Sequence, residues 1–292
     1  FMLKGIAASA GVSVAKVYKL ETPKVVIEMK TVEDVAAEVA KFEAALEKTK
    51  KDIEGVKERA AKRLSEEELA VFDAHLMMAG DPDLHDQVVA AINNDNVNAE
   101  YAVDSYANMA IAMFETLGEY FKERIADVKD VTFRLKCNLL GVLIPDLTSI
   151  AEDSVIVAHD LTPSDTAQLN EFVKGFATEI GGKTSHSAIM ANSLEIPAVV
   201  GCAGVLEAAN TGDIIALDAL DGEVVINPDE ETIAKYQAKA AQYAKEKEEL
   251  KVLKNEASIT SDGHQVELAG NIGGYADAEG VLNNGGEGPG LF

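Results

Sequence analysis

The stretch GGKTSHSAIMA, residues 181–191, is the most informative part of this sequence for the fold. Its two glycines permit a tight turn, and the short hydroxyls of Thr184 and Ser185 are suited to cap a helix. Good helix formers follow and predict a helix whose first turn carries His186. Three apolar residues of that helix have the spacing of one buried face, namely Ile189, Met190 and Leu194.

The position of His186 suggests a chemistry. At a helix N-terminus, unpaired N–H groups and the helix dipole favour negative charge. An imidazole nitrogen is also a competent nucleophile near neutral pH. A phosphoryl group on this ring would lie in a favourable field, so the stretch indicates reversible phosphorylation of His186. These residues alone leave open that the histidine merely caps the helix or satisfies a hydrogen bond.

The composition indicates a globular chain with room for two domains. It has 292 residues, of which 47% are hydrophobic. No apolar run is long enough to span a bilayer, and the first residues have no signal-peptide pattern. Cys137 and Cys202 form no CxxC motif, which argues against a disulfide framework and against a zinc site. We therefore expect a cytoplasmic protein with no membrane partner.

The charge balance restricts the possible partners. The formal net charge is −24, from 26 basic and 50 acidic residues. Such a field repels a phosphate backbone, so nucleic acid is excluded as a partner class, whereas a small basic protein would be attracted. The same charge is also explained by solubility alone.

The character of the chain changes near Pro23. Residues 3–20 are small and β-branched, with breaks at Gly5 and Gly11, and predict short strands. A capping-box-like sequence at 31–34 then predicts the start of a helix. The apolar residues of this helix repeat at spacings of four and three, as in a packed helical bundle; they are Val35, Val39, Phe42, Leu46, Thr49, Ile53 and Val56.

Further helices are predicted up to residue 140. Ser65 starts one with an apolar side made of Leu69, Phe72, Leu76 and Met77. The pair Asp81-Pro82 starts the next. Two amphipathic helices follow at 99–125 and 128–140, the second stopped by Gly141. The apolar residues of the first of these are Tyr106, Met109, Met113, Phe114 and Leu117. Residues 31–140 therefore predict an all-helical bundle.

The second half alternates strands with short helices. Strands are expected at 155–158, 173–180 and 197–201, and a short helix begins at Thr162 with a cap, a proline and an acid in place. Asp221-Gly222 predicts the turn of a hairpin over 214–226. This pattern is typical of an α/β unit. Strands on both sides of the bundle favour its insertion into one α/β domain, although two sequential domains remain an alternative.

The last part of the chain predicts a charged helix from Pro228 to about Ala257, for which a solvated face is the simple explanation. A strand is expected at 266–272. The glycine-rich run at 283–292 has nothing to connect, so we expect a truncated domain there.

With these motifs in place, the chain resembles the enzyme I family of the bacterial phosphoenolpyruvate-dependent sugar phosphotransferase system. The resemblance runs end to end and includes GIAASAGV at 5–12, DLTPSDTAQL at 160–169 and the histidine loop through IPAVVG at 196–201. The histidine loop is shared with pyruvate phosphate dikinase, whereas the first strands and the helical insertion are specific to enzyme I.

The resemblance implies an α/β phosphohistidine domain with an inserted all-α helical bundle, followed by a linker helix. The phosphohistidine domain would comprise residues 1–24 and 142–228, and residues 25–141 would bind the small phosphocarrier protein HPr. Residues 229–258 would form the linker helix, and 259–292 the truncated start of the carboxyl-terminal domain. In the family that domain binds phosphoenolpyruvate and Mg²⁺ and forms the homodimer.

The resemblance also implies roles for residues. His186 would be the phospho-acceptor, through the ring nitrogen remote from the backbone, and Thr166 would hydrogen-bond the imidazole or its phosphoryl group. Thr166 is equally explained as a hydroxyl in a capped first turn. The HPr docking surface would consist of Glu66, Glu67, His75, Met77, Met78 and Asp81. Each of these six could instead belong to the core or to a solvated helix face.

Several positions depart from the family pattern. Lys183, Lys129 and Asn192 stand where arginine is usual, although Arg134 keeps the family's cation near Lys129. Lysine keeps the charge but loses the bidentate geometry of arginine on phosphate. Pro289 stands where an aliphatic residue is usual. These changes leave the nucleophile in place and bear on the strength of phosphate binding.

The expected activity is exchange of a phosphoryl group with phospho-HPr, without loading from phosphoenolpyruvate by this chain alone. We expect no metal or cofactor in the chain itself, Mg²⁺ in the full-length enzyme, and a monomeric state for the fragment. Two alternatives remain. One is the phosphohistidine domain of a dikinase or a phosphoenolpyruvate synthase, and the other is a non-catalytic binding module in which His186 is structural.

Overall fold

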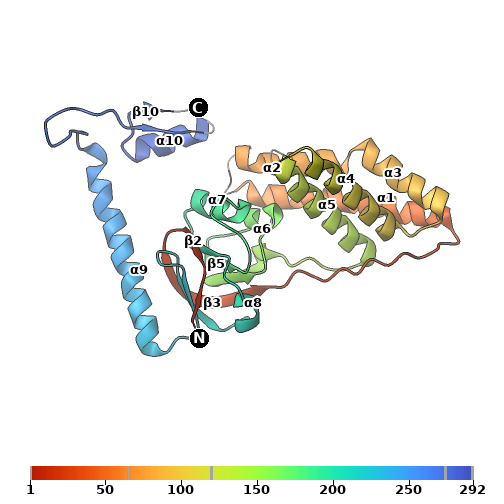
Figure 1. Ribbon diagram of the computed structural model, residues 1–292, viewed down its shortest axis with the longest axis horizontal. Helices are drawn as coiled ribbons and strands as arrows, with labels where there is room; N and C mark the ends of the chain where they lie inside the picture. Colours follow the sequence, from red (N-terminus) through yellow and green to blue (C-terminus); the bar gives the residue numbers. More distant parts are fainter. Residues whose placement is uncertain (1, 63, 65, 119–120, 273–274, 291–292) are drawn as a thin grey trace.

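The computed structural model describes residues 2–62, 64, 66–118, 121–272 and 275–290. A bundle of long helices lies at one end of the molecule and a mixed sheet with short helices lies beside it (Figure 1). A long helix runs from the sheet to a small unit at the carboxyl end. Among the described helices, none combines the length and the apolar character needed to cross a membrane.

One sheet of eight strands contains segments from both sides of the bundle. Its order is β1-β8-β7-β3-β4-β5-β6-β2. The strands are β1 (Met2–Lys4), β2 (Ile6–Ser9), β3 (Val12–Leu20), β4 (Ser154–Ala158), β5 (Val173–Thr178), β6 (Ala198–Val200), β7 (Ile214–Asp218) and β8 (Glu223–Ile226). β3 pairs in parallel with β4, with Val17 opposite Val155. The bundle is therefore inserted into this sheet, as the sequence predicted, rather than preceding a separate one.

The hairpin between β7 and β8 shows why its turn needs a glycine. Gly222 has a φ of +73°, and a Cβ there would lie 2.5 Å from the carbonyl oxygen of Gly5. The two residues are also hydrogen-bonded, because Gly5 N–H donates to Gly222 O at 2.9 Å. Gly222 thus lets the hairpin close against the first residues of the chain.

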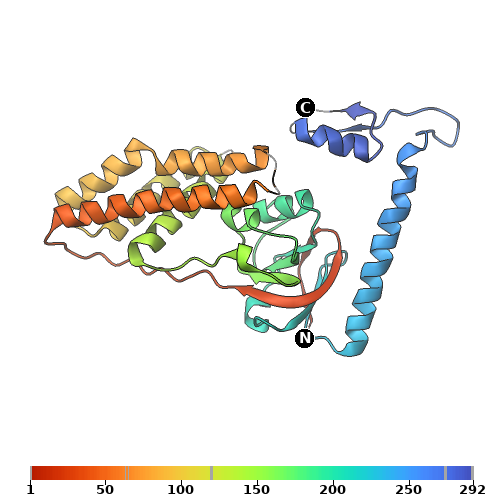
Figure 2. The same cartoon turned by 180° about the vertical axis from the view of Figure 1, so that it is seen from behind.

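Five helices form the inserted bundle: α1 (Val35–Ala60), α2 (Glu66–Ala79), α3 (Pro82–Asp95), α4 (Ala99–Thr116) and α5 (Lys122–Leu140). The connection from β3 runs along the bundle to its far end, and α1 returns toward the sheet (Figure 2). The apolar side predicted for α1 is confirmed, because five of its members are buried and Val35 and Val39 pack against the same core; the five are Phe42, Leu46, Thr49, Ile53 and Val56.

Two of the predicted helix ends are confirmed and one is wrong. Asp81 caps α3 by accepting from the Asp83 N–H at 2.9 Å, and Gly141 ends α5 in the left-handed region. α1, however, is capped by Asp34 and not by the start of the 31–34 motif. Thr31 instead forms a β-bridge with Val97. The predicted cap at Ser65 lies outside the described residues.

The long helix predicted at 99–125 is two helices. α4 ends at Thr116, and α5 begins at Lys122. Gly118 between them has a φ of +94°, which an α-helix does not allow. The inward side of α4 also differs from the prediction, because it consists of small residues rather than methionines; its buried apolar members are Ala99, Ala102, Val103, Ala107 and Ala110.

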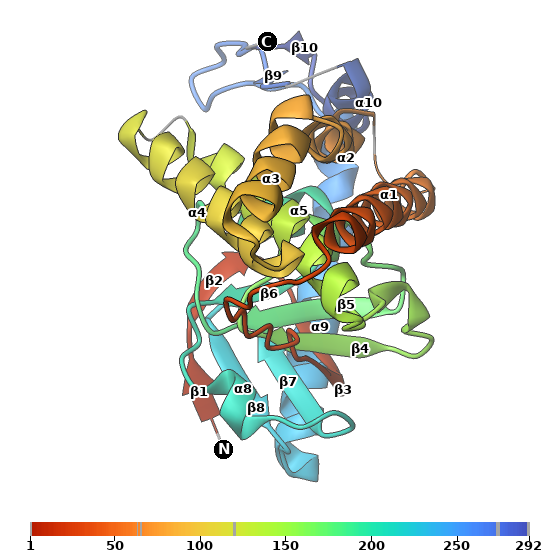
Figure 3. The same ribbon diagram turned by 90° about the vertical axis from the view of Figure 1, so that its right-hand side faces the viewer.

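Short helices cover the sheet where it meets the bundle. They are η2 (Leu147–Ser149), α6 (Pro163–Ala167), α7 (His186–Ser193) and α8 (Val205–Ala208). α6 contacts α1, α5 and α7, so it lies between the bundle and the sheet. Viewed end-on, the bundle lies above the sheet and α9 lies behind it (Figure 3).

The helix predicted from Pro228 is α9 (Glu230–Lys251), continued by η3 (Val252–Asn255). Its first half is fixed to the sheet, because Lys239 bonds to the buried carboxylate of Asp218 and Tyr236 O–H donates to Glu223 at 3.0 Å. Beyond it lie β9 (Ala269–Gly270), α10 (Tyr275–Asn283) and β10 (Gly288–Pro289). The strand predicted at 266–272 is thus reduced to two residues.

Candidate functional site

His186 is the first residue of α7, as predicted. Ser185 caps this helix: its Oγ donates to Gly182 O at 2.8 Å and accepts from the Ala188 N–H at 3.4 Å. Gly181 has a φ of +115°, so the tight turn before the cap requires a glycine there. The imidazole is exposed, at the end of a helix whose dipole favours an anion.

The buried face of α7 is not the one that was predicted. Ile189 is exposed, and Met190 is only partly buried. The residues that face the sheet are small, namely Ser187, Ala188 and Ala191. Small residues let α7 lie close to β2 and β6, which fixes the height of His186 above the sheet.

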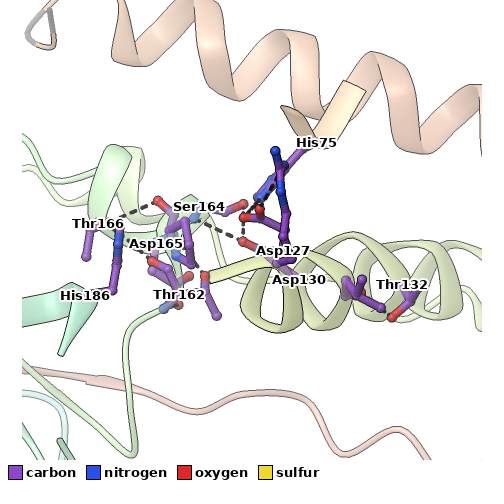
Figure 4. Close-up of polar contacts among 12 residues, drawn as sticks. His75, Asp127, Asp130, Thr132, Thr162, Ser164, Asp165, Thr166 and His186 are labelled. Carbon is purple, nitrogen blue, oxygen red and sulfur yellow. Dashed lines mark hydrogen bonds and ion pairs between the residues drawn. The ribbon is translucent and has the colours of Figure 1, made fainter. Parts of the chain in front are cut away.

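Thr166 meets His186 from the neighbouring helix α6. A complete capping box starts α6, in which Thr162 Oγ1 accepts from the Asp165 N–H and the Asp165 carboxylate accepts from the Thr162 N–H. This turn buries Thr166 and places its Oγ1 3.2 Å from His186 Nε2 and 3.0 Å from Pro163 O (Figure 4).

The Thr166 hydroxyl can serve the imidazole in two ways, because a hydroxyl donates one hydrogen bond and accepts others. When Nε2 carries a proton, it donates to Thr166 Oγ1, which in turn donates to Pro163 O. When Nε2 carries a lone pair, the hydroxyl can donate to it instead. The hydroxyl therefore holds the ring in place in both protonation states.

Two carboxyl groups near the site, those of Asp165 and Asp160, have raised pKa values. Burial raises the pKa of Asp165 to about 6, with a further contribution from the charge of Asp130, against the hydrogen bonds from Thr162. Burial also raises the pKa of Asp160, while the nearby imidazoles of His159 and His186 oppose that shift. In both groups burial disfavours the ionised form of the carboxyl.

A cavity of about 520 Å³ opens beside the imidazole, between α4, α5 and the α6 turn. Lys129 and Arg134 line it, together with Asp160 and His186. Lys183, in contrast, is exposed in the loop before α7. Asn192 donates from Nδ2 to Ala8 O at 2.8 Å and to Ala188 O at 2.9 Å, so it fastens α7 to β2 instead of facing the imidazole.

The residues predicted for partner docking do not all lie on one surface. Glu66, Asp81 and Met77 are exposed, Met77 by 77%. Met78 is partly buried against the bundle core. The side chain of Glu67 is not among those that the structure describes.

His75 corrects the prediction, because only 1% of its surface is exposed. Its Nε2 lies 3.0 Å from Asp127 Oδ1 on α5 (Figure 4). The histidine therefore fastens α2 to α5 inside the bundle and is not part of the docking surface. The sequence could not separate these two roles, because a single histidine on a predicted helix fits a core contact as well as a docking surface.

Three exposed apolar residues were predicted to face the core but lie outside. Met109 and Met113 on α4 are exposed by 53% and 52%, and Leu117 follows them at the end of that helix. Phe114 and Tyr106 are partly buried and pack, with Met78 of α2, against the cluster around Ala107. We use the name methionine face for Met109, Met113 and Leu117 at α4 together with Met77 of α2, all of which are exposed. Met109, Met113 and Leu117 are four residues apart, which is the spacing of a buried helix side, so periodicity alone could not identify them as exposed.

The described residues include no group of three or more His, Cys, Asp or Glu side chains arranged to hold a metal ion. Cys137 and Cys202 are buried free thiols. Burial raises the pKa of Cys202 to about 11, so neither its charge nor its exposure suits a nucleophile.

Two family models match the chain. Residues 4–124 match "PEP-utilising enzyme, N-terminal", and residues 150–222 match "PEP-utilising enzyme, mobile domain". The first match contains β2, β3 and most of the bundle, and the second contains α6, α7 and His186.

Curated relatives and solved structures match more of the chain. A phosphoenolpyruvate-protein phosphotransferase of Priestia megaterium is 52% identical over 99% of this chain, and one of Bacillus subtilis is 49% identical over 99%. The chain spans about half the length of these relatives, 51% in both cases. A solution structure of enzyme I (nEIt) aligns with a TM-score of 0.77 and 45% identity, covering 83% of this chain and 99% of that one.

Proposed function

The chain belongs to the enzyme I family of phosphoenolpyruvate-protein phosphotransferases, and from this premise we propose that His186 accepts a phosphoryl group and passes it reversibly to a histidine of HPr. The observation that carries the proposal is an exposed imidazole at a helix N-terminus whose Nε2 lies 3.2 Å from the buried Thr166 hydroxyl. A nucleophile in such a position is accessible to a macromolecular donor and is held in one orientation.

The proposed transfer needs no net movement of protons. With its proton on Nδ1, the His186 ring attacks the incoming phosphorus through the Nε2 lone pair. The bond between phosphorus and the carrier's ring nitrogen breaks, and its electron pair returns to that nitrogen. Thr166 O–H then donates to a phosphoryl oxygen instead of Nε2. The α7 N-terminus stabilises the phosphoryl charge, and the reverse reaction follows the same route.

The methionine face supports HPr as the partner, together with the acids beside it. Exposed apolar anchors ringed by charge suit a transient complex, and methionine adapts to an incoming surface. Glu66 and Asp81 lie on or next to α2, which supplies Met77. The net charge of −24 favours a basic partner and a fast encounter. We place the docking site on α2 and α4 on these grounds.

Phosphoenolpyruvate is proposed as the original donor in the longer enzyme. In the family, its binding site, the Mg²⁺ site and the dimer contacts belong to the carboxyl-terminal domain, and this chain spans about half the length of its relatives. We accordingly propose that the chain alone exchanges with phospho-HPr but is not loaded by phosphoenolpyruvate. A monomeric chain and a cytoplasmic location are part of the same proposal.

The topology supports the domain limits that we propose. We propose that residues 1–24 and 142–228 form the phosphohistidine domain, that 25–141 form the HPr-binding domain, and that 229–258 link them to a further domain that begins at 259. The pairing of β3 with β4 supports the first limit, since it brings the two segments into one sheet. The contacts of α9 with β3 and β7 support starting the linker at the edge of that domain, since they hold the helix against its sheet.

The test uses the chain with each donor. The purified chain is mixed with radiolabelled phospho-HPr, and the acid-labile label is mapped by mass spectrometry. We expect label on His186 and its return to unlabelled HPr. In a parallel reaction with phosphoenolpyruvate and Mg²⁺ we expect none. Label on another residue, or no label from phospho-HPr, contradicts the transfer. Loading by phosphoenolpyruvate alone contradicts the assignment of that step to the other domain.

A further inference from the structure

The helix that supplies Thr166 is too short to hold its own position. α6 has five residues, so few of its backbone groups can bond to one another within the helix. Besides its own capping box, a carboxylate of the bundle holds the start of α6 from outside. That carboxylate belongs to Asp130 on α5, far from α6 in the sequence and next to it in space (Figure 4).

The contact between Asp130 and α6 is short and buried. Oδ2 of Asp130 accepts from Ser164 Oγ at 2.8 Å and from the Ser164 N–H at 3.2 Å. Both residues are buried. Hydrogen bonds to a charged acceptor are stronger than neutral ones, and their loss leaves buried donors without a partner. The contact therefore fixes the first turn of α6 against α5.

The same turn ends at the imidazole. Thr166 follows Ser164 by two residues, and its Oγ1 is the atom within 3.2 Å of His186 Nε2. Gln168, at the end of α6, donates from Nε2 to Ser164 O at 2.9 Å, which ties the end of the turn to its start. A shift of Ser164 must therefore move the Thr166 hydroxyl relative to the ring.

We propose that Asp130 is a positioning residue for phosphoryl transfer at His186, acting through Ser164 and α6 on the Thr166 hydroxyl. The inference rests on the proposed transfer at His186. Asp130 does not touch the imidazole; it sets the distance and angle at which Thr166 meets Nε2. The bundle thus contributes a part to the reacting site as well as a surface for the partner.

Two roles of Asp130 can be separated by experiment: accepting hydrogen bonds from Ser164 and supplying a buried negative charge. Asp130 and Arg134, which is buried one turn further along α5, both act on the charge of Asp165 on α6. The role required here is to accept two hydrogen bonds. Asparagine retains one acceptor oxygen of the same reach, whereas alanine retains none, so the two substitutions separate a positioning role from a general need for charge.

The experiment compares Asp130→Ala and Asp130→Asn with a matched control, Glu100→Ala. Glu100 is another buried bundle carboxylate, on α4, and it pairs with Lys41 on α1. Three quantities are measured on each folded variant. They are the rate of phosphoryl exchange with phospho-HPr, the affinity for HPr, and the pH titration of the His186 ring nitrogens by ¹⁵N NMR.

We expect Asp130→Ala to slow exchange by about 10- to 100-fold, as a small misplacement of a catalytic contact does. HPr affinity stays unchanged, and the His186 titration midpoint shifts because the Thr166 contact is altered. Asp130→Asn returns the rate to within about threefold of the native chain. Glu100→Ala lowers stability but changes the rate by less than about twofold.

The proposal is overturned if Asp130→Ala exchanges at the native rate, or if Glu100→Ala slows exchange and moves the ring titration equally. Loss of exchange in Asp130→Ala with an unchanged titration would also contradict it. The titration needs no phosphoryl transfer. If the native chain takes no label while Asp130→Ala still moves the His186 titration, the proposed transfer fails and the positioning by Asp130 stands.

Discussion

The His186 site and the methionine face are built on opposite principles. The site consists of short side chains locked by hydrogen bonds, with Thr166 buried and its helix capped at the start. The methionine face consists of long, flexible side chains that are more than half exposed. The comparison teaches that this chain separates the two tasks: geometry is fixed where a bond is to be made, and adaptability is kept where a partner is to be recognised.

The largest effect expected from this division is at His186 itself. His186→Gln removes the nucleophile, and we expect exchange with phospho-HPr to fall below about one ten-thousandth of the native rate. The side chain is exposed, so the unfolding midpoint and the HPr affinity stay near native. Exchange assays, thermal unfolding and calorimetric titration check the three parts. Exchange at the native rate in this variant would show that His186 is not the phosphoryl acceptor.

The next largest effect tests whether the site depends on the fixed hydroxyl of Thr166. Thr166→Val keeps the volume of the side chain and removes the hydrogen bond to Nε2, and we expect exchange to slow by about 100-fold. Thr166→Ser keeps the hydroxyl and serves as the matched control, with a rate close to native. Equal rates for the two variants would mean that Thr166 only fills space.

A smaller effect concerns the acid that caps α6. The pKa of Asp165 is raised from 3.8 to about 6, so the folded state binds this proton more tightly than the unfolded chain. The ionised carboxyl therefore destabilises the fold above about pH 6, and this penalty is relieved as the pH falls toward 4.

Asp165→Asn removes that penalty while keeping an acceptor for the Thr162 N–H. At pH 8 we expect the free energy of unfolding of the variant to exceed the native value by about 2 kcal/mol, since the carboxyl keeps some contact with water. The difference narrows toward pH 4. Denaturant unfolding across this range measures it, and a difference that grows on acidification would contradict the assignment.

The smallest expected effect concerns the methionine face and its affinity for HPr. Met77→Ala combined with Met109→Ala weakens HPr binding by about tenfold, as loss of apolar anchors does. Stability changes little because both side chains are exposed. Met29→Ala is the control, since Met29 is exposed by 63% on the connection before α1. Equal affinity for the native chain and the double variant would locate docking elsewhere.

Much of the fold could be predicted from local signals. The capping box at Thr162, the proline after Asp81 and Gly141 each act within a few residues, and the structure has the helix ends that they indicate. The position of His186 at the start of α7 could be predicted from the sequence for the same reason. These helix ends are determined by hydrogen bonds and backbone angles within a few residues, so contacts with distant parts of the chain are not needed to predict them.

The errors have a common cause, which is that burial is decided by distant neighbours. Met109, Met113 and Ile189 have the spacing of core residues but are exposed, because small residues face the neighbouring elements instead. His75 was predicted on the surface but meets Asp127 of another helix. The contact of Asp130 with Ser164 joins two separate elements, and no local pattern contains it.

The parallel pairing of β3 with β4 has a consequence for the order in which the molecule assembles. Leu20 and Ala158 lie opposite one another in that ladder, and the whole bundle is the loop that the pairing must close. Closing so long a loop in a disordered chain is entropically unfavourable and slow, whereas helix contacts form locally and fast. The bundle should therefore gain structure first during refolding, and the central ladder, with the imidazole above it, should be completed last.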